Sequence, residues 1–287
     1  MRRAMSANGS APRFEIRRWA RVAATVARDP IDGLERVRER LATIRRNPSP
    51  AIGLRPAEAA DEQLHALLGS AWPCETATAF GPLWRSILKS LELQGLRFGR
   101  RAYCGWDDAD PGFARAAWCL TRHGAPRTVV ETGVARGLTT RVILEALSAN
   151  GSGRLCSIDL PPVMQEPSSA GRTGAAVGDT LKRRWTLVHG SSRRRLPRLL
   201  DELGTIDLFV HDSRHSDRNV SFELTRAWAA LRPGGFLLVD DVNRNGAFIP
   251  CVESFGHPQA IVCRSDDEGG LFGVIHKSPA TGLGILG

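Results

Sequence analysis

The sequence predicts an α/β fold in which a mostly parallel, doubly wound sheet is covered by helices on both faces. Short apolar runs of strand length recur along residues 128–277, and helix-like stretches separate the first six of them. The last two runs are joined only by residues 265–270, too few for a crossover helix, so we expect them to pair antiparallel. The seven expected strands span residues 128–131, 154–159, 185–189, 206–212, 235–240, 260–263 and 271–277.

A helical region is expected before the sheet. Apolar side chains at spacings of three and four predict a helix over residues 31–46, which Pro48 and Pro50 end. We therefore divide the chain into an arginine-rich arm with a helical N-terminal or lid region, residues 1–110, and a sheet domain, residues 111–287. Further helices are expected over residues 57–68, 80–93, 111–122, 139–147 and 217–231.

The positive charge of the chain is concentrated at its start. Twelve arginines, no lysine and five acidic residues lie within residues 1–50, which leaves little of the net charge of +9 for the remainder. We expect residues 1–30 to form a loosely attached arm. The basic clusters at 182–184 and 193–198 fit a solvated helix face, or a surface that meets an anionic group of a substrate.

The composition indicates a cytoplasmic protein with no membrane association. Apolar residues make up 42% of the chain and charged residues 24%, as in globular proteins. No apolar run approaches the roughly 18 residues that span a bilayer, and no secretory signal is visible. The six cysteines are scattered without a Cys-x-x-Cys pair, so we interpret them as reduced core residues and not as a disulfide or zinc framework.

A strand, a glycine-bearing turn and a helix follow one another at residues 128–147. The apolar strand ends on Glu131, and Gly133 and Gly137 let the loop turn sharply and approach a ligand closely. The dinucleotide fingerprint Gly-x-Gly-x-x-Gly is absent, because Ala135 stands where a middle glycine would. An acidic strand end suits a cationic ligand better than a pyrophosphate.

The second strand ends on Asp159, where an acid in nucleotide-binding α/β folds hydrogen-bonds ribose hydroxyls. Together these motifs resemble those of the class I S-adenosylmethionine (SAM) methyltransferases, whose Rossmann-like seven-stranded sheet has an antiparallel last strand. Each motif also has an alternative interpretation. The glycine-bearing loop could be an ordinary strand–helix turn, and Asp159 could only open the turn into Pro161. The resemblance implies SAM as cofactor and a cofactor site made of Glu131, Gly133, Ala135, Gly137, Thr139 and Asp159.

Three carboxylates follow the fourth and fifth strands. Asp212 ends the fourth strand and is followed by His215, whereas Asp240 and Asp241 end the fifth. Neighbouring parallel strands end at one edge of the sheet, so we expect these carboxylates to converge beside the cofactor. A divalent cation such as Mg²⁺ would relieve their repulsion. The alternative is that the aspartates cap the following helices and His215 faces water.

Residues 127–277 resemble the metal-dependent O-methyltransferases, the group of catechol O-methyltransferase. The antibiotic-sugar branch, with macrocin O-methyltransferase, fits better, because the catechol enzymes have Asp-Asn where this chain has Asp240-Asp241. The resemblance implies that Asp212, Asp240 and Asp241 bind the metal and that Asp212 also lies against the cofactor. It implies that Asp212 and His215 act in catalysis, His215 as the general base near the reacting hydroxyl.

Two further segments adjoin the expected site. Ser191 follows the third strand, near the adenine in this fold, and Ser192 is a candidate cap for the next helix. Tyr103 and Trp106 precede the sheet domain, and their segment either covers the cofactor or packs the N-terminal helices on the sheet. Methyltransferase-like bacterial proteins of unassigned substrate share the Trp-Asp-Asp motif that begins at Trp106.

The sequence favours an enzyme that methylates a hydroxyl of a small molecule or sugar in bacterial secondary or glycan metabolism. One rival is a nucleic-acid methyltransferase that uses the basic arm, but no base-flipping motif or aromatic-interleaved basic patch supports it. Others are an NAD-dependent oxidoreductase and a non-catalytic SAM-binding protein. The acceptor stays open among sugar, polyketide, catechol and peptide hydroxyls, and a homo-oligomer is compatible with the sequence.

Overall fold

The computed structural model describes residues 53–103, 107–160, 173–266 and 269–279, with 27, 30, 31, 33 and 34. The arginine-rich arm lies outside the described residues, as does most of the helix expected over 31–46. Within the described part, no helix is long and apolar enough to cross a membrane.

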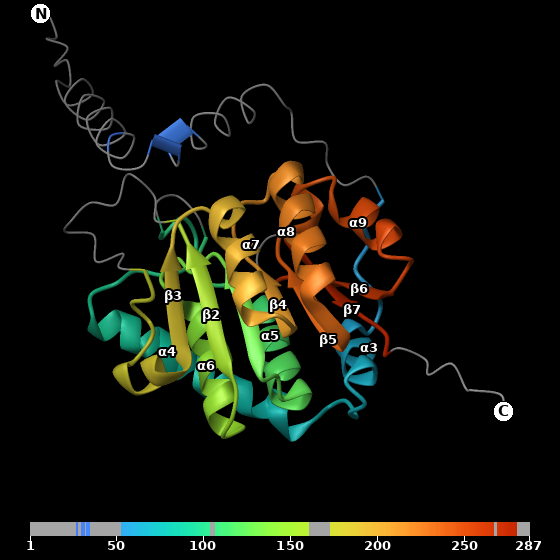
Figure 1. Cartoon of the computed structure of the whole chain (residues 1–287). Helices are drawn as coiled ribbons and strands as arrows, with labels where there is room; N and C mark the ends of the chain where they lie inside the picture. The colour runs from blue at the N-terminus through green and yellow to red at the C-terminus, as the bar shows by residue number, and fades with distance from the viewer. Residues whose placement is uncertain are drawn as a thin grey trace, which may run out of the picture.

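A single seven-stranded sheet runs through the centre of the molecule in the order β3-β2-β1-β4-β5-β7-β6 (Figure 1). The first five strands are parallel, with Val129 of β1 opposite Leu155 of β2 and Leu208 of β4. β7 lies between β5 and β6 and is antiparallel to both, which confirms the expected final hairpin. The strands are β1 (Thr128–Thr132), β2 (Arg154–Asp159), β3 (Trp185–His189), β4 (Ile206–His211), β5 (Leu231–Val239), β6 (Gln259–Arg264) and β7 (Leu271–His276).

Helices cover both faces of the sheet, as the alternating pattern predicts (Figure 1). On one face lie α3 (Ala60–Leu67), α4 (Glu75–Leu93), α5 (Pro111–Gly124) and α6 (Leu138–Ala149). On the other lie α7 (Ser192–Leu203), α8 (Asp217–Ala230) and α9 (Phe248–Ser254). Two short 3-10 helices lie elsewhere in the chain: η1 (Asp179–Arg184) precedes β3, and η2 (Val242–Arg244) precedes α9.

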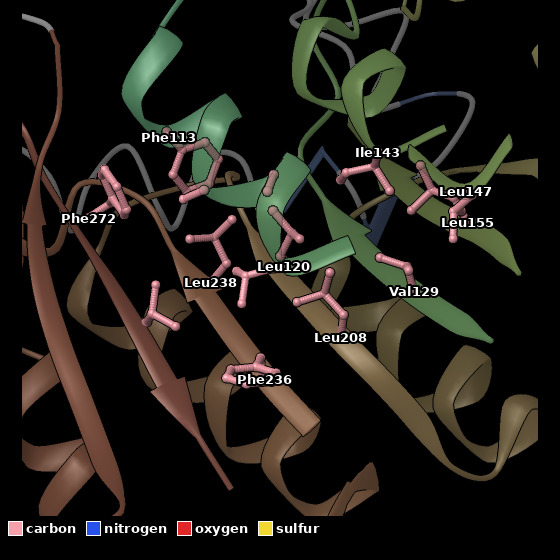
Figure 2. Packing of buried hydrophobic residues seen from close by; sticks show 14 of the residues in the cluster. Phe113, Leu120, Val129, Ile143, Leu147, Leu155, Leu208, Phe236, Leu238 and Phe272 are labelled. Atoms are coloured by element: carbon pink, nitrogen blue, oxygen red, sulfur yellow. The ribbon is translucent and has the colours of Figure 1, made fainter. Parts of the chain in front are cut away.

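Strand alternation divides the core into two layers. Val129 packs with the layer under α5 and α6, whereas its neighbour Val130 packs with the layer under α7 and α8, because successive strand residues point to opposite faces. Figure 2 shows the first layer, in which Phe113 and Leu120 of α5 lie over Leu238 of the sheet. Both faces are therefore buried, and the carboxyl edge of the parallel strands remains for a ligand.

The N-terminal helices pack on the sheet domain. The backbone N–H of Ala57 donates to Val262 of β6 at 2.7 Å, and Trp118 of α5 donates its indole N–H to the carbonyl of Thr76 in α4 at 2.7 Å. The inward face of α4 contributes Ile87 and Leu91 to an apolar cluster with α5 and α6. The described helices before residue 110 thus belong to the same packed body as the sheet.

Two elements begin four or five residues before their predicted starts. α4 begins at Glu75, five residues before the expected start at 80, because the sulfur of Cys74 accepts the backbone N–H of Ala77 and caps the helix. Cysteine is not among the residues that usually signal an N-cap. β5 begins at Leu231 in place of 235, because Leu231 already pairs with Ile206 of β4, before a register shift leads to the pair of Leu208 and Phe236.

Candidate active site at the carboxyl edge of the sheet

The loop after β1 needs glycine for a reason internal to the fold. Gly133 has a φ of 86°, and a Cβ built there would lie 1.8 Å from the backbone oxygen of Asp212. A Cβ at Gly137, where φ is 82°, would lie 2.9 Å from the Cα of Gly174, and Ala135 is also left-handed at 49°. Besides the approach to a ligand expected from the sequence, both glycines are therefore required by neighbouring backbone. Gly133 lets the ends of β1 and β4 meet.

Glu131 lies fully buried at the end of β1. One carboxylate oxygen accepts hydrogen bonds from the hydroxyls of Thr140 at 2.9 Å and Ser157 at 2.6 Å. The other oxygen is buried and has no hydrogen-bond partner among the described residues. Burial raises the pKa of Glu131 to about 7, although both hydroxyls act in the opposite direction. An unpartnered buried acceptor of this kind is suited to a cationic or N–H donor group of a ligand.

Asp159 ties the loop to the end of β2. Its Oδ1 accepts the backbone N–H groups of Val134 at 2.9 Å and Ala135 at 3.4 Å, and its Oδ2 accepts the hydroxyl of Thr173 at 3.2 Å. The aspartate therefore shapes the loop. Its oxygens retain capacity for further donors such as ribose hydroxyls, because a carboxylate has about four acceptor positions.

The two helix starts near this loop hold the remaining predicted cofactor residues. Gly137 is the N-cap of α6, so Thr139 lies in its first turn, half-buried. Ser191 is the N-cap of α7, and its side chain makes no capping hydrogen bond. The expectation that Ser192 caps this helix is wrong, because Ser192 is its first residue and its hydroxyl points toward the side chain of Asn219.

The predicted convergence after β4 and β5 is present. Asp212, His215 and Asp240 offer ligand atoms that all lie within 4.8 Å of one another. Burial raises the pKa of both aspartates well above the ordinary value. Repulsion from neighbouring carboxyl groups acts in the same direction, chiefly from Glu131 on Asp212 and from Asp212 on Asp240.

Asp212 does not cap α8, because the N-cap of that helix is Ser216. Asp240 does not cap the helices after β5, because the N-caps of η2 and α9 are Asp241 and Ala247.

Asp241 stands next to this group but faces other partners. Its backbone is left-handed, with a φ of 53°. One carboxylate oxygen lies 3.0 Å from Nε of Arg244, and the other lies 3.6 Å from Nε2 of His215. Asp241 still contributes negative charge to the cluster, because it raises the pKa of both Asp212 and Asp240.

His215 is held as a neutral imidazole. Burial, together with the nearby His211 and Arg244, lowers its pKa to about 3. Its Nδ1 is buried without a partner in the described protein, while Nε2 faces Asp241. A neutral imidazole with a free nitrogen can accept a proton or bind a metal.

Beneath this cluster lies a polar network that the sequence analysis missed. Glu223 of α8 is fully buried and accepts four hydrogen bonds, from His211 at 2.6 Å, Thr132 at 2.5 Å, Asn219 at 2.8 Å and Ser213 at 2.9 Å. Burial alone would raise the pKa of Glu223, but these partners outweigh it and lower the pKa to about 2. The network fixes the ends of β1 and β4 relative to α8.

A signal for Glu223 was present in the sequence. It lies at helical spacing from Val220 and Ala227, which are buried in the second core layer. A carboxylate on the apolar stripe of a helix requires a buried partner.

The segment before α5 covers the other side of the loop. The guanidinium of Arg136, in the loop after β1, pairs with Asp108, donates to the carbonyl of Ala102 at 2.8 Å and lies over the ring of Tyr103. Trp106 lies outside the described residues. The segment is thus anchored on the predicted cofactor loop.

The asparagines after β5 stabilise a turn. Asn243 bonds Gly269 and Leu271, and Asn245 bonds the backbone of Asp241 and Ala247. Their side chains are therefore engaged within the turn.

Comparison with known proteins identifies a methyltransferase domain over residues 130–242. Among solved structures, an O-methyltransferase from Bacillus cereus in complex with SAH is 16% identical, with a TM-score of 0.48 over 76% of this chain and 97% of that one. TomG from Streptomyces achromogenes, an O-methyltransferase of tomaymycin synthesis in complex with SAM, is 17% identical, with a TM-score of 0.46 over 68% of this chain and 89% of that one. The comparison with curated proteins found no match.

The matched domain contains every strand end described above, from Glu131 to Asp241. The strand order, with its antiparallel β7, is that of the methyltransferases and differs from the parallel sheet of the dehydrogenases. Residues 130–242 therefore match a methyltransferase domain, which confirms the resemblance to methyltransferases predicted from the sequence.

Proposed function

We propose that the protein transfers the methyl group of SAM to a hydroxyl of a small molecule or sugar, with a divalent cation at the acceptor. The observation that carries this proposal is the convergence of Asp212, Asp240 and His215 directly beside the loop from Glu131 to Gly137. A nucleophile can thus be oriented and deprotonated next to the electrophile, which is the requirement of O-methylation. Bacterial secondary or glycan metabolism is the proposed setting.

The cofactor half of the site fits SAM. Glu131 offers a buried oxygen without a partner, which suits the cationic cofactor, and Asp159 retains acceptor capacity for ribose hydroxyls. The backbone of the loop through Ala135 is proposed to lie against the cofactor. Ser191 and Thr139, at the starts of α7 and α6, are proposed to line the same site. Bound SAM supplies the methyl group on a positively charged sulfur.

The acceptor half fits a divalent cation. Asp212 and Asp240 are close carboxylates whose pKa values burial and repulsion raise, and a cation would hold them ionised. Asp241 is proposed as the third carboxylate of the set. A cation there supplies positive charge that lowers the pKa of the acceptor hydroxyl. Oxygen ligands favour Mg²⁺, whereas participation of the His215 nitrogen would favour Mn²⁺ or another transition metal.

His215 is proposed to accept the proton of the acceptor hydroxyl. Its imidazole is neutral at physiological pH, and its Nδ1, which has no partner among the described residues, is available to take the proton. A pKa of about 3 makes it a weak base, so this role requires that the cation lower the pKa of the hydroxyl. Asp241, facing the other nitrogen, would stabilise the imidazolium that forms. Asp212, between the two halves, would orient the acceptor.

Metal binding tests the acceptor half without knowledge of the acceptor. Mn²⁺ binding followed by electron paramagnetic resonance should weaken at least tenfold in Asp212→Asn and Asp240→Asn. SAM affinity should persist in Asp240→Asn. The matched control is Asp201→Asn, an exposed residue of α7. Unchanged Mn²⁺ binding in both site variants would leave a metal-independent methyltransferase with His215 as base.

A hydroxyl-compound panel tests the reaction itself. Release of S-adenosylhomocysteine should depend on an acceptor with a free hydroxyl and should fall in His215→Ala, with an altered pH profile. Methylation of RNA or DNA in the same assay, with salt-sensitive binding, would instead support a nucleic-acid methyltransferase.

A further inference from the structure

A second group of potential metal ligands lies among the N-terminal helices, in a different part of the fold from the carboxyl edge of the sheet. It consists of His65 in α3, Cys74 before α4 and His123 in the last turn of α5. The sulfur of Cys74 lies 3.3 Å from Nε2 of His65 and 3.4 Å from Nε2 of His123. Three side chains from three helices thus point their ligand atoms at one position.

The spacing matches that of a tetrahedral zinc site. Zinc binds thiolate at about 2.3 Å and imidazole nitrogen at about 2.0–2.1 Å, which places sulfur and nitrogen about 3.5 Å apart around a tetrahedral ion. Both distances from Cys74 agree with this value within a few tenths of an ångström. Little movement is therefore required to admit the ion.

The orientation of His65 is that of a metal ligand. Its Nδ1 lies 2.7 Å from the backbone carbonyl of Asp61, and a carbonyl can only accept, so Nδ1 carries the proton. The lone pair of Nε2 is consequently directed at Cys74. Metal-bound histidines show this arrangement, in which a backbone carbonyl fixes the tautomer. The ring is also held in place by Trp72, whose centroid lies 4.7 Å away.

The sulfur of Cys74 is fixed in position at the start of α4. It accepts the backbone N–H of Ala77 at 3.3 Å as the N-cap of that helix. A single thiol proton could serve only one of the two imidazoles. A cation instead satisfies all three ligand atoms together.

The position of the cluster leaves one side accessible. His65 is only 1% exposed, whereas Cys74 and His123 are half-buried. Cys74 also lines a shallow apolar hollow with Pro73, Glu75 and Thr78. Three protein ligands with an open fourth position would therefore be completed by water.

We propose that His65, Cys74 and His123 form a zinc site that fastens α3 and α4 to α5. Because α5 packs on the sheet, the ion would link the N-terminal helices to the methyltransferase domain. The sequence analysis missed this site because its ligands are 9 and 49 residues from Cys74 and follow no zinc-ligand spacing.

Cobalt substitution tests the site in the full-length protein. Metal-stripped protein given Co²⁺ should develop a thiolate-to-cobalt charge-transfer band and tetrahedral visible absorption. The carboxyl edge of the sheet has no cysteine ligand, so the band reports Cys74. Zn²⁺ should displace the cobalt, and the band should disappear when one Zn²⁺ per chain has been added.

Ligand variants then locate the ion. Competition with a chromophoric chelator should show Zn²⁺ affinity at this site falling at least about 100-fold in Cys74→Ser and His123→Ala. The matched controls are Cys251→Ser and His257→Ala, in and after α9, which should bind as the wild type does. Asp240→Asn should keep the cobalt band.

Absence of a charge-transfer band from the wild-type protein would overturn the proposal and leave a hydrogen-bonded Cys–His cluster. A band that persists in Cys74→Ser would also overturn it. If the variants fail to fold, alkylation of Cys74 in the wild type decides: Zn²⁺ should protect it, and equal alkylation with and without Zn²⁺ would contradict the site.

Discussion

Two buried glutamates, one on each side of the site, behave in opposite ways. Glu131 and Glu223 are both fully buried, yet the pKa of Glu131 is raised to about 7 and that of Glu223 is lowered to about 2. Glu131 has two hydroxyl partners on one oxygen and none on the other, whereas both oxygens of Glu223 have protein partners.

This difference distinguishes a carboxylate that binds a ligand from one that stabilises the fold. Around Glu223 the protein supplies every partner, so this carboxylate stabilises the fold in its ionised form. Around Glu131 the protein leaves one acceptor for something else, and we assign that place to the cofactor. The unpartnered buried oxygen of Glu131 is thus where we expect a ligand group to bind.

The largest expected effect is on stability. Glu223→Ala should lower the free energy of unfolding by about 3–5 kcal/mol, because it leaves the imidazole of His211 and the amide of Asn219 buried without their partner. Chemical denaturation measures this, with Glu202→Ala, an exposed residue of α7, as control. A loss as small as that of the control would mean that Glu223 does not support the site.

The pH dependence of stability should have opposite signs at the two glutamates. The lowered pKa of Glu223 adds stability that is present above its ordinary value of 4.5 and is lost as the pH falls toward 2. The raised pKa of Glu131 makes the folded state hold a proton longer, so its contribution declines as the pH rises from 4.5 to about 7.

In the absence of ligand, each of these two pH ranges should change the free energy of unfolding by about 3 kcal/mol. Denaturation of Glu131→Gln across these pH values should show a smaller decline between 4.5 and 7 than the wild type, because Asp212 and Asp240, whose pKa values are also raised, remain in the variant. A wild type and a Glu131→Gln variant with parallel profiles would contradict the raised pKa.

A smaller effect is expected on cofactor affinity. Asp159→Ala should weaken SAM binding by roughly 1.5–3 kcal/mol, since hydrogen bonds to a charged group are worth about this much. The variant also frees the backbone of Val134 and Ala135 from their acceptor. Calorimetry measures the change, and Asp179→Ala, which is exposed, should bind SAM normally. Equal affinities would exclude Asp159 from the cofactor site.

The smallest effect sharpens the role of Glu131. Thr140→Val removes one hydroxyl donor with little change of shape and should cost about 0.5–1.5 kcal/mol of stability. It should also raise the pKa of Glu131 further, because one interaction that lowers it is gone. The midpoint of the pH profile should therefore move upward, and an unmoved midpoint would show that Thr140 does not act on Glu131.

The sequence predicted those parts of the molecule that depend on local pattern. Glu131, Asp159, Asp212 and Asp240 were found because each follows an apolar strand, and parallel strands bring such ends to one edge. The antiparallel hairpin followed from the shortness of its loop.

The rest depends on tertiary packing. The hydroxyl of Thr132 meets Glu223 across 91 residues, and no local pattern announces that contact. Gly133 looked like a ligand contact, but its constraint is the backbone of Asp212. Cys74 joins two histidines only because three helices pack together.

Calorimetric titration of the full-length protein with SAM tests the central claim most directly. We predict saturable binding of one SAM per chain, weakened when Glu131 is replaced by glutamine, and no binding of NADH. Binding of NADH with none of SAM, or SAM binding indifferent to both Glu131→Gln and Asp159→Ala, would contradict the account.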